Sequence, residues 1–204
     1  MAADYEFFTT WRIPGTVAEV REVLADAEGL PRWWPSVYLW VAVVNPGGAD
    51  GVGRALDLHT KGWLPYTLRW RLTVTEPMTD GGFAIAASGD LDGTGRWTFT
   101  PEGPEVVVTY DWRVSATKPL LRRLTWLLRP VFSANHHWAM ARGEESLRLE
   151  VRRRRAAGEG GAASVPPPPP PTFARVTGAL ACRSRQPLPP PSRHGEAPET
   201  GASP

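Results

Sequence analysis

Apolar and polar residues alternate along much of the first 116 positions of the chain. Leu68, Trp70 and Leu72, for example, are each flanked by polar neighbours. An alternation with a period of two is typical of a β-strand with one buried face. The same signal predicts strands at residues 5–13, 37–45, 53–60, 66–75, 83–87, 96–100 and 106–114. Because the connections are short, we expect an antiparallel sheet of about seven strands, with a hairpin turn at Asp92–Gly93.

Two short helices are predicted between the first and second strands. Thr16 can cap a helix at residues 17–25, and Glu19 completes the pattern of a capping box. A second helical turn is expected at residues 27–33. It must end before Pro35, because proline cannot continue a helix and disfavours helical backbone at the residue before it.

A long helix is predicted at the end of this pattern. From residue 119 the apolar positions recur with a period of 3.6, and this continues to residue 155. Pro130 lies inside the stretch and predicts a kink or a restart there. A helix of this length needs an equally long apolar partner, which the concave face of the sheet can provide. A cavity is then expected wherever side chains do not fill the space between sheet and helix.

Two adjacent tryptophans end the second short helix, within the segment LPRWWP. Neighbouring residues of such a turn point in different directions, so the two indoles are expected to play different parts. We expect Trp34 to fill the core between the short helices and the long helix. Trp33 is expected at the mouth of the cavity or on the surface, beside Arg32.

The composition changes after residue 155. Residues 156–204 are rich in Ala, Gly, Pro and Ser, and include six consecutive prolines at 166–171. Such a segment buries too little apolar surface to offset the entropy lost on ordering. We therefore expect a domain at residues 1–155 and a disordered tail at residues 156–204, with polyproline II conformation at its prolines. A tail of this kind could bind a protein partner.

Charge and cysteine content limit the location and the partners. The net charge is only +2, which gives no electrostatic indication of nucleic-acid binding, and the arginines at 152–155 suit the C-terminal end of a helix. Cys182 is the single cysteine, so a reducing compartment fits. The N-terminus lacks the apolar run of a secretory signal, and no segment has the length of a membrane span. We expect a soluble, cytoplasmic protein.

Several segments resemble one family of proteins. These are LPRWWP, TKGWLPYTLRW, SGDLDGTGRWTF, VTYDWRV and NHHWAMARGEESLRLE. Over residues 4–155 the chain resembles the SRPBCC superfamily, the START/Bet v 1-like helix-grip group, and within it the bacterial polyketide cyclase/dehydrase-like members. The resemblance implies an α+β helix-grip fold with a deep hydrophobic cavity. It also implies diverse roles, which include lipid or polyketide carriage, aromatase/cyclase activity, iron-containing hydroxylase domains and chaperone regulation.

Aromatic residues dominate the expected inner faces of the strands and of the long helix. Large indoles beside small side chains leave irregular space, which suits a flat apolar ligand. The candidate ligand-binding residues are Phe7, Trp11, Trp70, Trp97, Phe99, Tyr110, Trp112, Phe132, Ala139 and Met140. The leading hypothesis is a domain that binds a small hydrophobic or aromatic molecule, such as a lipid or polyketide, without a cofactor.

Acid–base catalysis in the cavity is an alternative hypothesis. A cyclase or dehydratase needs a proton acceptor and a proton donor against an apolar wall. Asn135 lies on the inward stripe of the long helix and His136 flanks it, whereas His137 is expected on the surface. Tyr66 and Tyr110 on the strands complete the catalytic candidates. In a third hypothesis the domain is a regulatory or scaffold module that acts through its surface and its proline-rich tail.

Metal-dependent and nucleophilic chemistry is not favoured. The four histidines do not have the HxxxH or HxH spacing of metal ligands, and no Cys-x-x-Cys or Gly-x-Ser-x-Gly motif occurs. His59 alternates with Asp57 and Lys61 on one strand face, a pattern that usually indicates a solvated surface. We therefore expect neither a metal ion nor a cofactor.

Overall fold

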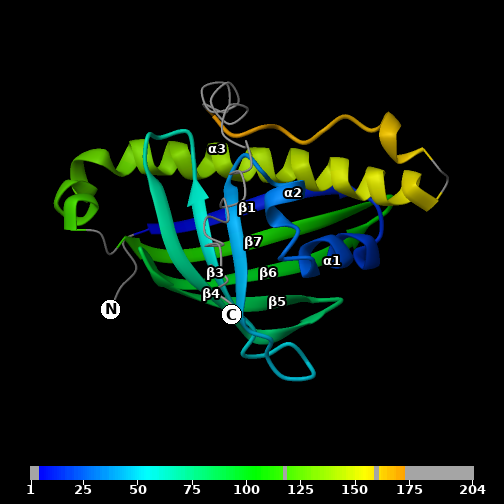
Figure 1. Ribbon diagram of the computed structural model, residues 1–204, viewed down its shortest axis with the longest axis horizontal. Helices are drawn as coiled ribbons and strands as arrows, with labels where there is room; N and C mark the ends of the chain where they lie inside the picture. Colours follow the sequence, from blue (N-terminus) through cyan, green and yellow to red (C-terminus); the bar gives the residue numbers. More distant parts are fainter. Residues whose placement is uncertain (1–4, 117–118, 159–160, 173–204) are drawn as a thin grey trace, which may run out of the picture. The chain divides into compact units, whose positions relative to one another are not determined.

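The computed structural model describes residues 5–116, 119–158 and 161–172. A curved antiparallel sheet packs against one long helix, and two short helices connect the first two strands (Figure 1). In chain order the elements are β1 (Tyr5–Pro14), α1 (Val17–Ala25), α2 (Leu30–Trp33), β2 (Tyr38–Asn45), β3 (Ala55–Lys61), β4 (Thr67–Thr79), β5 (Gly82–Gly89), β6 (Leu91–Glu102), β7 (Glu105–Ala116), α3 (Pro119–Gly158) and the 3₁₀ turn η1 (Ala162–Ser164). The α+β helix-grip prediction is confirmed.

The seven strands form a single sheet in the order β1-β7-β6-β5-β4-β3-β2. Every neighbouring pair is antiparallel. The first strand, β1, lies at one edge of the sheet and pairs with the last strand, β7, so that Phe7 lies opposite Trp112. The predicted hairpin turn at Asp92–Gly93 is wrong, because both residues lie within β6. A Cβ atom at position 93 would lie 2.0 Å from the Arg113 carbonyl oxygen, so this glycine lets two strands approach closely. The turn occurs earlier, between β5 and β6, where Gly89 has a φ of +115°.

The helix α3 runs along the concave face of the sheet (Figure 1). Pro130 lies inside the helix without ending it, and the helix continues past residue 155 to Gly158. Met140, Leu147 and Val151 are buried on the face that packs against the sheet. None of the helices in the described part of the chain combines the length and the apolar character needed to cross a bilayer.

The predicted capping box begins α1. The Thr16 hydroxyl accepts a hydrogen bond from the Glu19 amide at 3.3 Å, and the Glu19 carboxylate accepts one from the Thr16 amide at 2.7 Å. The same carboxylate accepts a hydrogen bond from the Arg155 guanidinium at 2.6 Å. This bond and those from Thr16 outweigh partial burial and lower the pKa of Glu19 to about 2. One side chain therefore fastens the start of α1 to the end of α3.

The two adjacent tryptophans are both buried, which corrects the prediction for one of them. Trp34 fills the core as expected, with 4% of its surface exposed. Trp33 is 0% exposed and does not lie at a cavity mouth or on the surface. Its indole nitrogen donates a hydrogen bond to the Asp26 carbonyl oxygen at 3.2 Å, at the end of α1. The indole thus adds a second hydrogen bond to a carbonyl oxygen that also accepts one from the Gly29 amide, while it packs against the short helices.

A buried carboxylate joins α2 to the C-terminal part of α3. Glu150 is 1% exposed and accepts hydrogen bonds from Arg32 at 2.7 Å, Arg153 at 2.7 Å and Arg154 at 3.1 Å. Arg154 also donates to the Asp26 carboxylate at 2.7 Å. Three of the four consecutive arginines, 153–155, therefore form ion pairs within the domain.

The chain continues beyond α3 as a strap, which we define as residues 161–172. Figure 1 shows it running back along α3. Arg153 donates a hydrogen bond to the Pro166 carbonyl oxygen at 2.8 Å, and the Lys61 ammonium donates one to the Thr172 carbonyl oxygen at 2.9 Å. The compact unit that contains the sheet and α3 accordingly extends to Thr172. The strap lies within residues 156–204, which were predicted as a disordered tail. The prediction for residues 173–204 falls outside the described residues.

Candidate functional site

A hollow of about 170 Å³ lies between the sheet and the middle of α3, and we call it chamber one. Its wall is mostly aromatic and aliphatic. Seven of the predicted ligand-binding residues line it: Phe7, Trp70, Tyr110, Trp112, Phe132, Ala139 and Met140. The predicted catalytic residues Asn135, His136 and Tyr66 line it as well. The structure therefore brings most of the predicted site residues to one hollow.

The other three predicted ligand-binding residues lie elsewhere. Trp97 lines a second hollow, described below. Trp11 and Phe99 line neither hollow and are packed in the core. The ring of Trp11 lies 5.6 Å from that of Trp34, and the ring of Phe99 lies 6.3 Å from that of Phe83. An inward-facing position on a strand is thus not enough to identify a cavity residue.

Some residues of the wall were not predicted. Leu68 was expected to face inward with Trp70 but was not chosen as a site residue. Tyr38 begins β2, where seven consecutive apolar residues do not show which positions face inward. Trp34 reaches chamber one from outside the regular strands, and no periodic signal in the sequence would place it there.

The floor of the hollow is a stack of rings from β6 and β7. The ring of Tyr110 lies 4.0 Å from that of Trp97 and 5.6 Å from that of Trp112, with interplanar angles of 17° and 19°. Gly95 makes this arrangement possible. A Cβ atom there would lie 2.6 Å from the Tyr110 hydroxyl oxygen and 2.8 Å from Cε3 of Trp112. The missing side chain lets the Tyr110 and Trp112 rings pack face to face above this part of β6, so the stack turns ring edges toward the hollow.

His136 lies on the cavity side of α3. Its ring stacks on Phe7 with centroids 3.9 Å apart, whereas His137 is exposed as expected. The Nε2 atom of His136 is buried and has no hydrogen-bond partner among the described residues. Burial, with a smaller effect of the neighbouring His137, lowers the pKa of His136 to about 4. The imidazole is therefore uncharged at neutral pH.

We expect the His136 ring resonances in an NMR titration to stay unchanged between pH 8 and pH 5. The unfolded chain takes up a proton at this residue near pH 6.5, but the folded protein does so only near pH 4. The free energy of unfolding should therefore fall as the pH falls from 6.5 to 4. In His136→Phe, which keeps the stacking on Phe7, this part of the pH dependence should disappear. A titration of His136 near pH 6.5 would contradict the prediction.

Asn135 supports the loop between β3 and β4. Its side-chain oxygen accepts hydrogen bonds from the amides of Trp63 at 2.9 Å and Leu64 at 3.3 Å. Gly62 provides the space for this contact, because a Cβ atom there would lie 2.1 Å from the same oxygen. The amide oxygen of Asn135 is therefore occupied by the loop backbone, which leaves less of the side chain free for catalysis.

Four tyrosines line chamber one: Tyr5, Tyr38, Tyr66 and Tyr110. The hydroxyls of the last three form no hydrogen bond with another described residue. Burial raises the pKa of Tyr66 to about 12, with a smaller effect of Tyr5, and burial also raises the pKa values of Tyr38 and Tyr110. All three remain neutral phenols that can donate or accept a hydrogen bond.

A second hollow of about 180 Å³, chamber two, lies between the sheet and the short helices. Trp33, Leu30 and Leu24 line it from the helices, and Trp97 and Phe83 line it from the sheet. Its wall is also mostly apolar. The space between the sheet and the helices is therefore hollow at two places along the sheet.

The chain was compared with known proteins. Residues 6–160 match the model of the polyketide cyclase/dehydrase and lipid transport family. The chain belongs to this family. A search of curated proteins gives no significant match. The family membership agrees with the observed architecture, a START/polyketide cyclase-like ligand-binding fold.

Solved structures share the fold of this polyketide cyclase/dehydrase and lipid transport family member. One is TTHA0849 from Thermus thermophilus, with 23% identity and a TM-score of 0.56 over 76% of this chain and 99% of that chain. A second is the ZhuI aromatase/cyclase from a Streptomyces species, with 17% identity and a TM-score of 0.56 over 74% and 95%. A third is a START superfamily protein from Mycobacterium smegmatis, with 16% identity and a TM-score of 0.54 over 72% and 97%. At these identities the likeness shows the fold.

Two of the three polar residues predicted on one face of β3, Asp57 and His59, lie together on the outer face of the sheet. Asp57 forms a two-point ion pair with Arg71, with N–O distances of 2.7 and 3.1 Å. His59 lies on the same face, but Lys61, which we expected beside them, lines chamber one at the end of β3. Within the described residues, no three His, Cys, Asp or Glu side chains gather in a way that could hold a metal ion.

Proposed function

We propose that this domain binds a small, uncharged, mostly apolar ligand in chamber one, with an aromatic ring against the floor and a polar group toward the tyrosine hydroxyls. The observation that carries the proposal is a hollow of about 170 Å³ with a largely apolar wall, in which the hydroxyls of Tyr38, Tyr66 and Tyr110 have no hydrogen-bond partner among the described residues. A dry cavity of about 150 Å³ can hold benzene. The ligand part held in this conformation is therefore about one ring in size.

The electrostatics of the wall favour an uncharged ligand. Lys61 is the one charged side chain among the described residues that line chamber one. Its ammonium group donates a hydrogen bond to the Thr172 carbonyl oxygen at the end of the strap. His136 is neutral, and so are the tyrosines. A buried charge without a partner is costly, so a cationic ligand would lose more hydration than this wall could replace, and an anionic ligand would find only Lys61 as a partner.

The same groups are poorly suited to acid–base catalysis. A general base works best when its pKa lies near the pH of the reaction, and the pKa of His136 is lowered to about 4. As an acid, Tyr66 has a pKa raised to about 12. These values favour binding over proton transfer, and the cyclase or dehydratase hypothesis remains a prediction. Loss of turnover of a poly-β-keto substrate in His136→Ala, with an intact fold, would support that alternative.

The binding proposal is tested with two probes of nearly equal shape, toluene and p-cresol. We expect both to bind to the purified protein, and p-cresol to bind about three- to tenfold more tightly, because one hydrogen bond contributes about 0.5–1.5 kcal/mol. Isothermal titration calorimetry and NMR shift mapping measure affinity and place. Tyr66→Phe and Tyr110→Phe remove one hydroxyl each, and the preference for p-cresol should shrink in at least one of them. Failure of both probes to bind at millimolar concentration would refute the proposal.

A further inference from the structure

Chambers one and two adjoin each other and share part of their lining. Five residues line both hollows: Trp34, Tyr38, Trp70, Tyr110 and Met140. Each hollow is close to the volume that holds a single aromatic ring. The interior is thus divided, although the fold itself requires only a sheet opposite one long helix.

The floor beneath the two chambers is continuous. Trp97 belongs to chamber two, Tyr110 to both chambers and Trp112 to chamber one. Their rings follow one another at centroid distances of 4.0 and 5.6 Å and are nearly parallel. The three rings are stacked face to face, so one row of ring edges runs beneath both chambers and does not itself divide the cavity.

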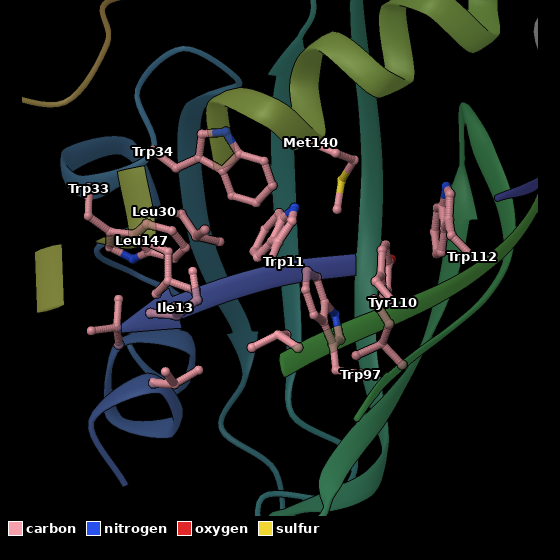
Figure 2. Close-up of a cluster of buried hydrophobic side chains, with 14 of the residues drawn as sticks. Trp11, Ile13, Leu30, Trp33, Trp34, Trp97, Tyr110, Trp112, Met140 and Leu147 are labelled. Carbon is pink, nitrogen blue, oxygen red and sulfur yellow. The ribbon is translucent and has the colours of Figure 1, made fainter. Parts of the chain in front are cut away.

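The aromatic members of the wall are held in place by other rings. Trp34 packs edge-on against Tyr38 at 5.1 Å, and Trp70 lies 6.0 Å from Trp112. Met140 is the one shared residue that comes from α3, and it is 5% exposed. Figure 2 shows its side chain extending from the helix toward the rings of the sheet. An unbranched thioether has three rotatable bonds and adapts its shape readily, so it is the most easily displaced part of the wall.

We propose that Met140 determines the length of the ligand: it closes the grip cavity between the two chambers, so that each chamber accepts one ring and a longer flat molecule is excluded. This inference rests on the proposed binding function and adds the ligand size that the site selects. A shorter side chain at position 140 would join the chambers above the continuous floor of rings.

The test compares toluene, a one-ring probe, with anthracene, whose three fused rings exceed either chamber. We expect the original protein to bind toluene in both chambers, seen by NMR as separate shift changes around Trp112 and around Phe83. Anthracene should bind at least tenfold more tightly to Met140→Ala than to the original protein. Met140→Leu, which keeps the volume of the wall, should behave like the original protein.

Met78→Ala is the matched control for added volume. Met78 lines chamber two alone, so this change enlarges a hollow without joining the two. Its affinity for anthracene should stay within threefold of the original value. If Met140→Ala does not fold, Met140→Val, which also removes the end of the side chain, is measured in the same way.

The outcomes separate the two proposals. Toluene binding with no gain in anthracene affinity at position 140, or an equal gain in Met78→Ala, would overturn the role of Met140 and leave the binding function standing. Failure of the original protein to bind either toluene or p-cresol would overturn both. A gain of tenfold or more that is confined to the shortened residue 140 would support the division of the cavity.

Discussion

Replacing Gly143 with alanine is expected to lower the free energy of unfolding by about 2 kcal/mol, although the same change in an exposed helix raises it by about 1 kcal/mol. A Cβ atom at position 143 would lie 2.3 Å from Cζ2 and 2.6 Å from Cη2 of Trp34, and 2.8 Å from Cζ2 of Trp11. Both indoles are buried, so neither can move without displacing other core side chains. Urea or thermal unfolding measures the effect.

A double-mutant cycle tests this cause. Trp34→Phe removes the two ring atoms that approach Gly143 most closely, at the cost of a cavity. The double variant Trp34→Phe, Gly143→Ala should therefore lose less stability than the sum of the two single changes. Ala134→Gly, at an exposed position of α3, measures helix propensity separately. Strict additivity, or a Gly143→Ala protein more stable than the original, would show that the contact with Trp34 is not limiting.

Replacing Glu150 with alanine is expected to lower the free energy of unfolding by about 3 kcal/mol. Removing one partner of a buried ion pair typically costs about 3–5 kcal/mol, and the low end applies here because the Arg32 side chain is 54% exposed and can regain water. Burial opposes ionisation of Glu150, but hydrogen bonds from Arg32, Arg154 and Arg153 outweigh it and lower its pKa. The carboxylate thus remains charged and holds α2 against α3.

The acid dependence of stability provides a second measurement of Glu150. Because its pKa is lower in the folded protein than in the unfolded chain, its contribution is complete above about pH 4.5 and is lost as the pH falls through the folded value. Glu150→Gln should flatten this part of the stability curve. Glu145→Gln, which alters an exposed ion pair with Arg142, should change stability by no more than about 0.5 kcal/mol. Equal losses of stability in Glu150→Gln and Glu145→Gln would refute the special position of Glu150.

Much of the fold could be predicted because it depends on local patterns. The alternation in β4 and β7, and the capping box of Thr16 and Glu19, are each set within a few residues of the chain. The exceptions depend on distant contacts. Asp92–Gly93 has the composition of a turn, yet Gly93 serves the close approach of β7. Trp33 is buried because the end of α1 offers its indole a carbonyl oxygen, which no pattern around Trp33 reveals.

The site could be predicted as a region but not in its details. Alternation placed Tyr110 and Trp112 on the inner face, helical periodicity placed His136 beside the inward stripe of the long helix, and all three line chamber one. Whether an inward side chain meets empty space depends on what stands opposite. Trp11 faces inward too, but Trp34 and Trp97 fill the space around it. The division into two chambers arises from residues on separate elements and has no signature along the chain.

Four indoles form a continuous series from α2 to β6. Trp33 lies 5.7 Å from Trp34, Trp34 lies 5.6 Å from Trp11, and Trp11 lies 5.2 Å from Trp97, as Figure 2 illustrates. Indoles fixed at such distances couple their electronic transitions, so this protein should have an intense near-ultraviolet circular dichroism spectrum. That signal depends on fixed side-chain packing and is lost when packing becomes fluid. The core therefore contains its own optical reporter, with both ends, Trp33 and Trp97, in the wall of chamber two.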